Sequence, residues 1–145
     1  GLAGGRLGWA VEAHLHPEQR ERRAALQEQI VALVTATRDA RMRLVAPLAT
    51  DTDAARAAVE AWTLWWRDVL LATVGMTTLS SSGQARALAE RLGRAIGPIA
   101  AEAFLRRLVA ARQQLDQNAN PRLVLEVLAL DMPLPSAPAA ARRPS

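Results

Sequence analysis

The segment from 115 to 133, LDQNANPRLVLEVLALDMP, constrains the fold of this chain more than any other. Asn120 and Pro121 interrupt a helical pattern and restart it, because asparagine caps helices and proline fits the first helical position. The restarted helix is apolar on nearly every side, and its charged residues are Arg122, Glu126 and Asp131. A helix that is apolar all round has to be buried on all sides, by its own domain or by neighbouring subunits. The segment therefore favours a helical domain built for assembly rather than for catalysis.

The remainder of the chain predicts an all-α fold, since helical spacing recurs and the alternation typical of strands is absent. Gly75 is expected to end one helix, Gly93 and Gly97-Pro98 to interrupt another, and Asn118 to end a third in a left-handed conformation. With an opening helix and the final one, this gives a helical bundle of about five to six helices. The expected central helices run from about 17 to 48, 52 to 74, 84 to 92 and 98 to 117.

Three regions follow from composition. Residues 1–16 are expected to form a glycine-rich turn and a short amphipathic helix, which lead into a helical domain expected at 17–133. Residues 134–145 are rich in Pro, Ala, Ser and Arg, and such a composition predicts a flexible tail because it cannot bury a core. Since the chain begins at Gly1 without Met, we expect it to be a piece of a longer protein.

Charge and cysteine content narrow the class of protein. All 18 basic residues are arginine, but the net charge is only +4, so the high pI does not by itself indicate nucleic-acid binding. Cysteine is absent, which excludes disulfides and Cys-ligated metal sites and fits a cytoplasmic protein. No apolar run reaches the roughly 18 residues that a membrane span needs. We expect no membrane partner.

Candidate catalytic and metal-binding residues have simpler structural explanations. His14 and His16 are two residues apart, which places them on different sides of a helix. Asp51 and Asp53 stand at a helix start, where capping explains them. The Ser80–Ser82 run lacks the context of a nucleophile, and the glycine-rich opening GLAGGRLG does not match a phosphate-binding motif. The expectation is therefore no catalytic residue, no metal, no cofactor, no small-molecule substrate and no enzymatic activity in this chain.

Aromatic and basic residues each have a structural and a functional interpretation. Trp62, Trp65 and Trp66 interleave with leucine and valine at helical spacing, which favours core packing over a platform for nucleic-acid bases. The 84–112 stretch is locally basic, and a solvated helix face is the default interpretation. Contact with a partner or with a phosphate backbone stays open as an alternative.

Three segments resemble bacterial clamp-loader subunits of the DNA polymerase III holoenzyme. The opening GRLGWA of 5–10 is similar to a G-x-P-G-x-A segment that precedes the collar domain in that family. The central WTLWWRDVLL of 62–71 resembles the tryptophan-rich helix of delta-prime collars. The closing segment is similar to L-x-x-N-x-N-x-x-L-x-L-E-x-L-x-L-x-x-P, and the matching residues are Leu115, Asn118, Asn120, Leu123, Leu125, Glu126, Leu128, Leu130 and Pro133.

The resemblance implies a collar domain at 17–133, entered from the lid region of an AAA+ module at 1–16. In gamma/tau subunits the position of Gly8 resembles a sensor arginine that contacts nucleotide. A glycine offers no charge to a phosphate, so Gly8 favours the ATPase-inactive delta-prime type. The implied function is assembly of the pentameric loader that places the sliding clamp on DNA. The implied partners are the gamma/tau and delta subunits, with DNA reached only through the complex.

Two alternatives to a delta-prime collar stay open. One is the collar of a gamma/tau subunit, and the other is a helical regulatory or nucleic-acid-binding domain that uses the arginines of 84–112. Under the collar interpretation, we expect the turn before the final helix and the helix itself to lie near a subunit contact. The candidate interface residues are Asn118, Asn120, Arg122 and Glu126.

Overall fold

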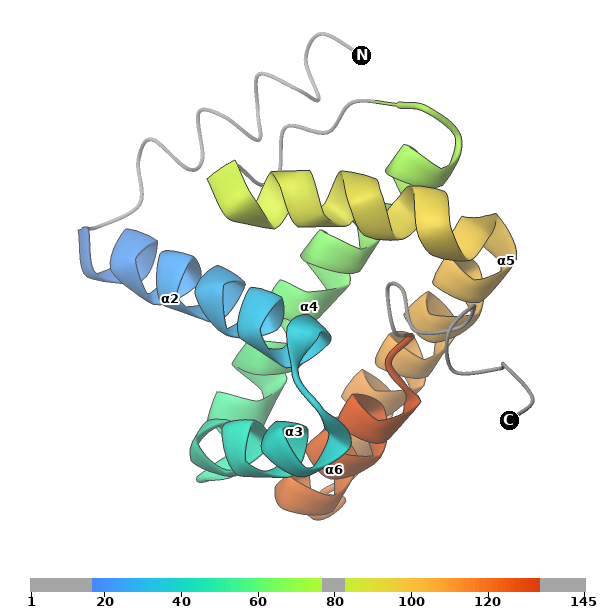
Figure 1. Cartoon of the computed structure of the whole chain (residues 1–145). Coiled ribbons are helices and arrows are strands. Elements are labelled where there is room, and N and C mark those ends of the chain that lie inside the picture. The colour runs from blue at the N-terminus through green and yellow to red at the C-terminus, as the bar shows by residue number, and fades with distance from the viewer. Residues whose placement is uncertain (1–16, 77–82, 134–145) are drawn as a thin grey trace, which may run out of the picture.

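The computed structural model describes residues 17–76 and 83–133, and within these ranges it contains helices and no strand. The all-α prediction is confirmed. In the labels of Figure 1, the elements are α2 (Pro17–Thr35), α3 (Arg38–Val45), the 3-10 helix η1 (Ala46–Ala49), α4 (Thr52–Thr73), α5 (Gly83–Asp116) and α6 (Pro121–Asp131). The regions predicted at 1–16 and 134–145 lie outside the described residues.

Helix α4 is the centre of the bundle, and its most extensive contact is with α5. Helix α5 bends at Gly97, where φ is 81° and ψ is 170°, and Pro98 begins the second arm. Only glycine adopts this backbone conformation readily. Figure 1 shows the first arm crossing α4, whereas the second arm runs back beside α6. The bend therefore lets one helix cover α4 and also support α6.

Three tryptophans of α4 form the centre of the core. Trp62, Trp65 and Trp66 are each at most 1% exposed. The ring of Trp66 packs against Phe104 of the second arm with 4.8 Å between centroids, and the Trp65 indole donates a 2.9 Å hydrogen bond to the Ala85 carbonyl of the first arm. The prediction of core packing is confirmed, and these buried rings offer no stacking surface to a nucleic-acid base.

The expected helix from 17 to 48 is wrong, because the chain breaks at Ala36 and Thr37 and forms α2, α3 and η1. Thr37 is extended, and its hydroxyl accepts a 3.2 Å hydrogen bond from the amide of Ala40 at the start of α3. At the end of α2, the Thr35 hydroxyl donates to the carbonyl of Val31. The threonine cap at Thr37 thus begins a helix at a point that no glycine or proline marks.

Gly93 does not interrupt α5, contrary to the sequence prediction. The helix passes through it, and a Cβ built on Gly93 would lie 2.7 Å from the Val69 carbonyl oxygen and 2.9 Å from the Ala72 Cβ. The glycine therefore permits close approach of the α4 backbone rather than ending a helix. The prediction of a bend at Gly97-Pro98 is confirmed.

Helical spacing predicts that the buried side of the second arm is formed by Leu105, Leu108, Val109 and Leu115, and this prediction is wrong at one position. Leu108 and Leu115 are fully buried, as expected, but Val109 is 53% exposed. Val109 lies about 100° around the helix from Leu108, so it sits at the edge of the face that packs on α4 and stays partly exposed.

Two predicted helix boundaries are confirmed. Asp51 caps α4 with a 2.7 Å hydrogen bond from the amide of Ala54. Gly75 ends α4 with φ of 78°, and the amide of Met76 donates to the carbonyl of Leu71 over 2.9 Å. This is the hydrogen bond of a Schellman motif.

In the described ranges, no helix is both long enough and apolar enough to cross a membrane.

Candidate protein interface

Helix α6 begins at a capped turn formed by the Asn-x-Asn sequence. The Asn120 side chain accepts a 3.1 Å hydrogen bond from the amide of Leu123, and Pro121 occupies the first helical position. Before this cap, Asn118 has φ of 66°, and the amide of Ala119 donates to the carbonyl of Gln114 over 2.9 Å. The predicted left-handed ending and the predicted cap are both confirmed. Together they turn the chain sharply, so that α6 packs back on α5.

Burial of α6 on all sides is not what the structure shows. Val124, Leu125, Leu128 and Ala129 are buried, but Leu123 is 59% exposed, Val127 46% and Leu130 43%. These last three are spaced i, i+4 and i+7, so they form one stripe along the helix. We call them the α6 stripe. The described part of the chain covers one face of α6 and leaves the other apolar face to solvent.

Ion pairs border the α6 stripe on both sides. Arg122 and Glu126 pair along one edge at 3.1 Å. At the other edge, Asp131 pairs with Arg107 of α5 at 2.8 Å. Beside this second edge, a groove of about 290 Å³ runs between α5 and α6 and includes Leu123 and Val127. An apolar centre with a charged rim is the arrangement found at protein–protein interfaces.

The end of α6 is held by a buried arginine that sequence reasoning did not identify. Arg41 of α3 is 1% exposed. Its guanidinium donates to the carbonyls of Leu33 and Val34 at the end of α2, at 2.9 and 3.3 Å. It also donates to the carbonyls of Ala129 and Met132 at the end of α6, at 2.7 and 3.1 Å.

All four acceptors of Arg41 are carbonyls at two helix C-termini, which carry partial negative charge and lack partners within their helices. Burial lowers the pKa of the Arg41 guanidinium, and the positive charge of Arg38 lowers it further. Arginine nevertheless stays protonated in proteins. Arg41 therefore supplies one fixed cation that joins the ends of α2 and α6, and it sets the position of the α6 stripe relative to the core.

The four predicted interface residues lie together at the start of α6. Asn118 and Asn120 are exposed and shape the turn, while Arg122 and Glu126 pair with each other. The sequence prediction omitted Leu123, Val127 and Leu130 from the set, although their spacing was visible. It assumed that every apolar residue of this helix would be buried.

Substitution tests whether the left-handed backbone conformation at Asn118 contributes to the stability of the protein. Replacement by alanine is expected to lower the free energy of unfolding by about 1 kcal/mol, because a Cβ without a compensating side-chain hydrogen bond is strained in the left-handed region. Replacement by glycine should leave it unchanged or raise it slightly. Chemical denaturation of the two variants measures this, and equal losses for both would show that the backbone conformation at 118 is not the cause.

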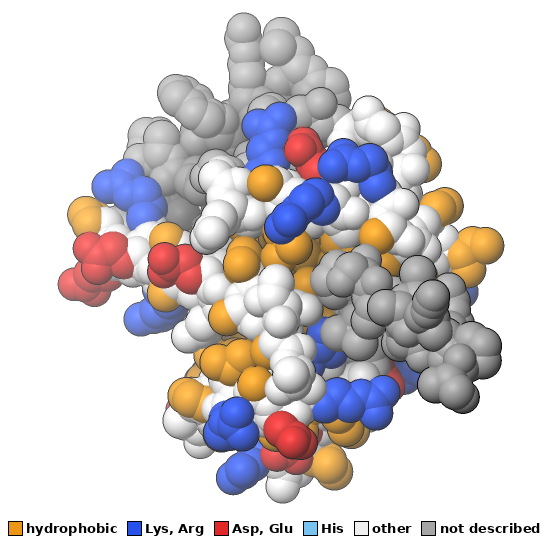
Figure 2. All heavy atoms as spheres, viewed as in Figure 1, with side chains coloured by type: hydrophobic (Ala, Val, Ile, Leu, Met, Phe, Trp, Pro, Cys, Tyr) orange, Lys and Arg blue, Asp and Glu red, His pale blue; other side chains and the backbone are white. Residues whose placement is uncertain are grey.

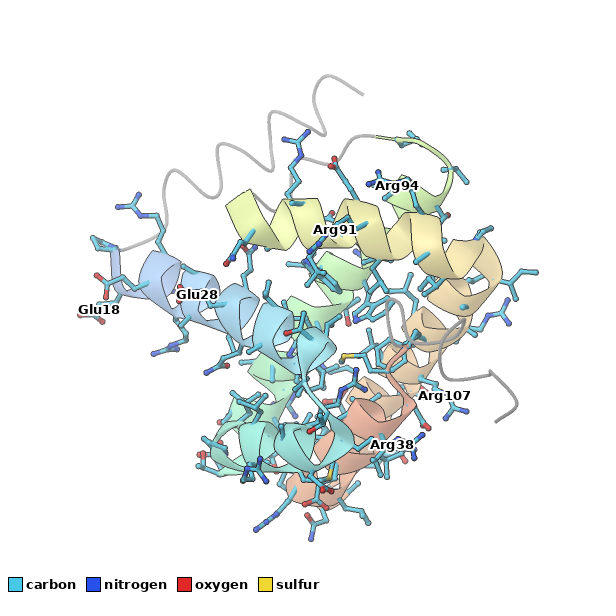
Figure 3. All side chains as sticks on the ribbon, in the orientation of Figure 1. Glu18, Glu28, Arg38, Arg91, Arg94 and Arg107 are labelled. Atoms are coloured by element: carbon cyan, nitrogen blue, oxygen red, sulfur yellow. The ribbon has the colours of Figure 1, made fainter. Side chains whose placement is uncertain are left out.

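The basic stretch 84–112 does not form one uninterrupted positive face. Arg86 pairs with Glu90 at 3.6 Å, Arg106 with Glu102 at 3.2 Å and Arg107 with Asp131, and Arg112 pairs with Glu60. Arg91 and Arg94 have no acidic partner within the described residues, and they lie on the first arm of α5, whereas Arg107 lies on the second (Figure 3). In Figure 2, basic side chains over the first arm accompany an acidic one. Acidic side chains of the described residues thus compensate four of the six arginines in this stretch, which reduces the positive charge available to a phosphate backbone.

Several other predictions fall on residues that the structure does not describe. His14, His16, the glycine-rich opening with Gly8, and Ser80–Ser82 lie outside the described ranges. Within those ranges, no three His, Asp or Glu side chains are grouped so that they could hold a metal ion. Asp51 serves as a cap, as stated above, and Asp53 pairs with Arg56 at 3.0 Å.

Comparison with protein-family models, with curated proteins and with solved structures yields no match to this chain.

Proposed function

We propose that this chain is the oligomerisation (collar) domain of a clamp-loader subunit, of the delta-prime type. The observation that carries the proposal is the α6 stripe: Leu123, Val127 and Leu130 stay exposed between two ion pairs. It lies on the helix whose sequence resembles the closing helix of such collars. Its proposed partners are the gamma/tau and delta subunits of a cytoplasmic loader, and the domain itself performs no catalysis.

The chemistry of the α6 stripe supports assembly. Three large apolar side chains at helical spacing can enter a groove on a partner, and their burial removes apolar surface from water. The ion pairs at the rim would exclude water from this centre and fix the orientation of the partner. Asn118 and Asn120 hold the start of α6, and Arg41 holds its end, so the stripe is presented on a rigid support.

Substitutions on the α6 stripe are expected to weaken association with gamma/tau. Leu123→Glu and Val127→Glu each place a charge at the centre of the proposed contact, and each should lower the affinity by about tenfold or more. Ile99→Glu is the control, because Ile99 is 85% exposed and lies at the bend of α5. Sedimentation equilibrium with the gamma/tau collar of the same organism measures the affinities. Equal affinities for all three variants would remove α6 from the interface.

The rim is tested by exchanging its charges. The double variant Arg122→Glu, Glu126→Arg keeps an i, i+4 ion pair and places the glutamate first, which is the more favourable order, so α6 should remain at least as stable as before. Association with gamma/tau should nevertheless weaken, because the charges offered to the partner are reversed in position. Unaltered assembly would contradict the assignment of Arg122 and Glu126 to the contact.

A further inference from the structure

A second groove, of about 810 Å³, lies between α2, α4 and the second arm of α5. The α5 residues that line it are 108, 109, 112 and 113, whereas 107, 110, 111 and 114 line the groove beside α6. These two sets point to opposite sides of the second arm. The larger groove contains no α6 residue, so it is a surface separate from the α6 stripe.

The residues that line the groove are suited to the docking of one more helix. Its floor is a row of α4 side chains at i, i+4 and i+7, which are Ala57, Ala61 and Leu64. Two small side chains on the floor allow the backbone of an incoming helix to approach closely. Leu26 of α2 and Val109 of α5 form the apolar walls. Leu64 is 40% exposed and Val109 53% exposed, so the described residues leave this apolar surface open.

Arginines from all three helices stand around the groove. They are Arg22 of α2, Arg67 of α4 and Arg112 of α5, and the acidic side chain among the lining residues is Glu60. Glu60 already pairs with Arg112. Arg22 and Arg67 form no ion pair with an acidic side chain of the described ranges. The rim therefore carries two positive charges that nothing in the described groove balances.

We propose that this groove binds an amphipathic helix of a partner protein, with an apolar stripe flanked by acidic residues. The apolar stripe would lie on Ala57, Ala61 and Leu64, and the flanking carboxylates would pair with Arg22 and Arg67. Helix α6 of a second copy fits less well, because it brings Arg122 and its acidic residues are already paired with Arg122 and Arg107. The proposal does not depend on the collar function.

The test uses two synthetic peptides of roughly 16 residues, or about four helical turns. Both carry leucine at i, i+4, i+7 and i+11, and the flanking positions are glutamate in one and arginine in the other. Fluorescence anisotropy with the full chain at low salt should show about tenfold tighter binding of the glutamate peptide. In NMR spectra of the chain, the backbone amide signals that shift when the peptide binds should be those of Ala61, Leu64 and Val109 rather than those of α6.

Charge reversal at the groove distinguishes binding of the glutamate peptide in this groove from its general attraction to a basic protein. Arg22→Glu with Arg67→Glu should abolish the preference for the glutamate peptide. The matched control is Arg20→Glu with Arg43→Glu, because both arginines are exposed and neither lines the groove. The control should keep the preference.

Three results would each overturn the proposal. One is equal binding of the two peptides, and another is equal loss of preference in the control. The third is self-association of the unmodified chain that Arg67→Glu removes, which would assign the groove to a second copy.

Loss of gamma/tau binding in α6 variants that still bind the glutamate peptide would separate the two surfaces experimentally.

Discussion

Replacement of Arg41 by methionine is expected to lower the free energy of unfolding by about 3 kcal/mol or more, and the melting temperature by about 10 °C. Methionine keeps most of the apolar length of the side chain, but it donates no hydrogen bond. The carbonyls of Leu33, Val34, Ala129 and Met132 then lose their shared donor, whereas the carbonyl of Leu33 keeps the amide of Ala36 at 3.3 Å. Each unsatisfied buried carbonyl costs about 1–3 kcal/mol, offset in part because a buried charge is removed.

The control for Arg41→Met is Arg43→Met. Both arginines lie in α3, but Arg43 is exposed. Its replacement should change the free energy of unfolding by no more than about 0.5 kcal/mol. Urea denaturation followed by tryptophan fluorescence measures both variants. A loss for Arg41→Met as small as that for Arg43→Met would show that the four hydrogen bonds contribute little.

Arg41→Lys separates geometry from charge. Lysine retains the positive charge near the two helix ends, yet its single ammonium cannot reach four carbonyls from the positions of a planar fork. The free energy of unfolding of Arg41→Lys is therefore expected to lie between those of the parent protein and Arg41→Met. If lysine restored full stability, the interaction of charge with the two helix dipoles would be sufficient and the fork geometry would not matter.

Replacement of Gly93 by alanine is expected to destabilise the protein by about 2 kcal/mol. Helix propensity alone predicts a gain of about 1 kcal/mol for the same change, so the two effects differ in sign. The structure favours the loss, because the added Cβ would lie 2.7 Å from the Val69 carbonyl oxygen and 3.1 Å from the Thr73 nitrogen. These are backbone atoms of α4, and they can move only if the two helices separate.

Ala87→Gly calibrates the contribution of helix propensity at an exposed position of the same arm. It should cost about 1 kcal/mol. Thermal denaturation of both variants compares steric contact with propensity. A Gly93→Ala protein that is more stable than the parent would mean that α4 and α5 are not in backbone contact at this point.

The helical spacing of apolar residues, together with the residues that mark helix ends, was enough to predict most of the fold. The pattern of α4 identified its buried tryptophans, and Asp51, Gly75 and Asn118 marked helix ends by residue type alone. The break at Thr37 escaped prediction because a threonine cap carries little signal when no glycine or proline stands beside it. Gly93 was misinterpreted because its role depends on α4, which is distant in sequence.

Arg41 illustrates a different limit. Arg41, Val45 and Leu48 have the spacing i, i+4 and i+7, so periodicity alone would place Arg41 on the buried side of its helix. Arginine is seldom buried without a partner, and residue type therefore argues for exposure. The acceptors that resolve this conflict come from the ends of α2 and α6, and the end of α6 lies about 90 residues further along the chain. Local sequence does not contain that information.

The turn and helix that carry the candidate interface were predicted, but the exposed apolar stripe beside the predicted residues was not. The Asn-x-Asn turn and α6 lie where the sequence placed them, and Arg122 and Glu126 are paired on the surface. The apolar centre between the ion pairs was missed, because the sequence cannot say which side of an apolar helix its own domain covers. The packing of Val124, Leu125 and Leu128 on the core decides this, and it leaves Leu123, Val127 and Leu130 outside.

Assembly is tested most directly by size-exclusion chromatography with light scattering, on the chain alone and mixed with the gamma/tau and delta subunits of the same organism. A collar domain predicts one mixed species of defined stoichiometry, whose mass includes the chain, and its disruption by Val127→Glu. Separate elution of the chain from those subunits, with the same profile for the parent and Val127→Glu, would contradict the proposed function.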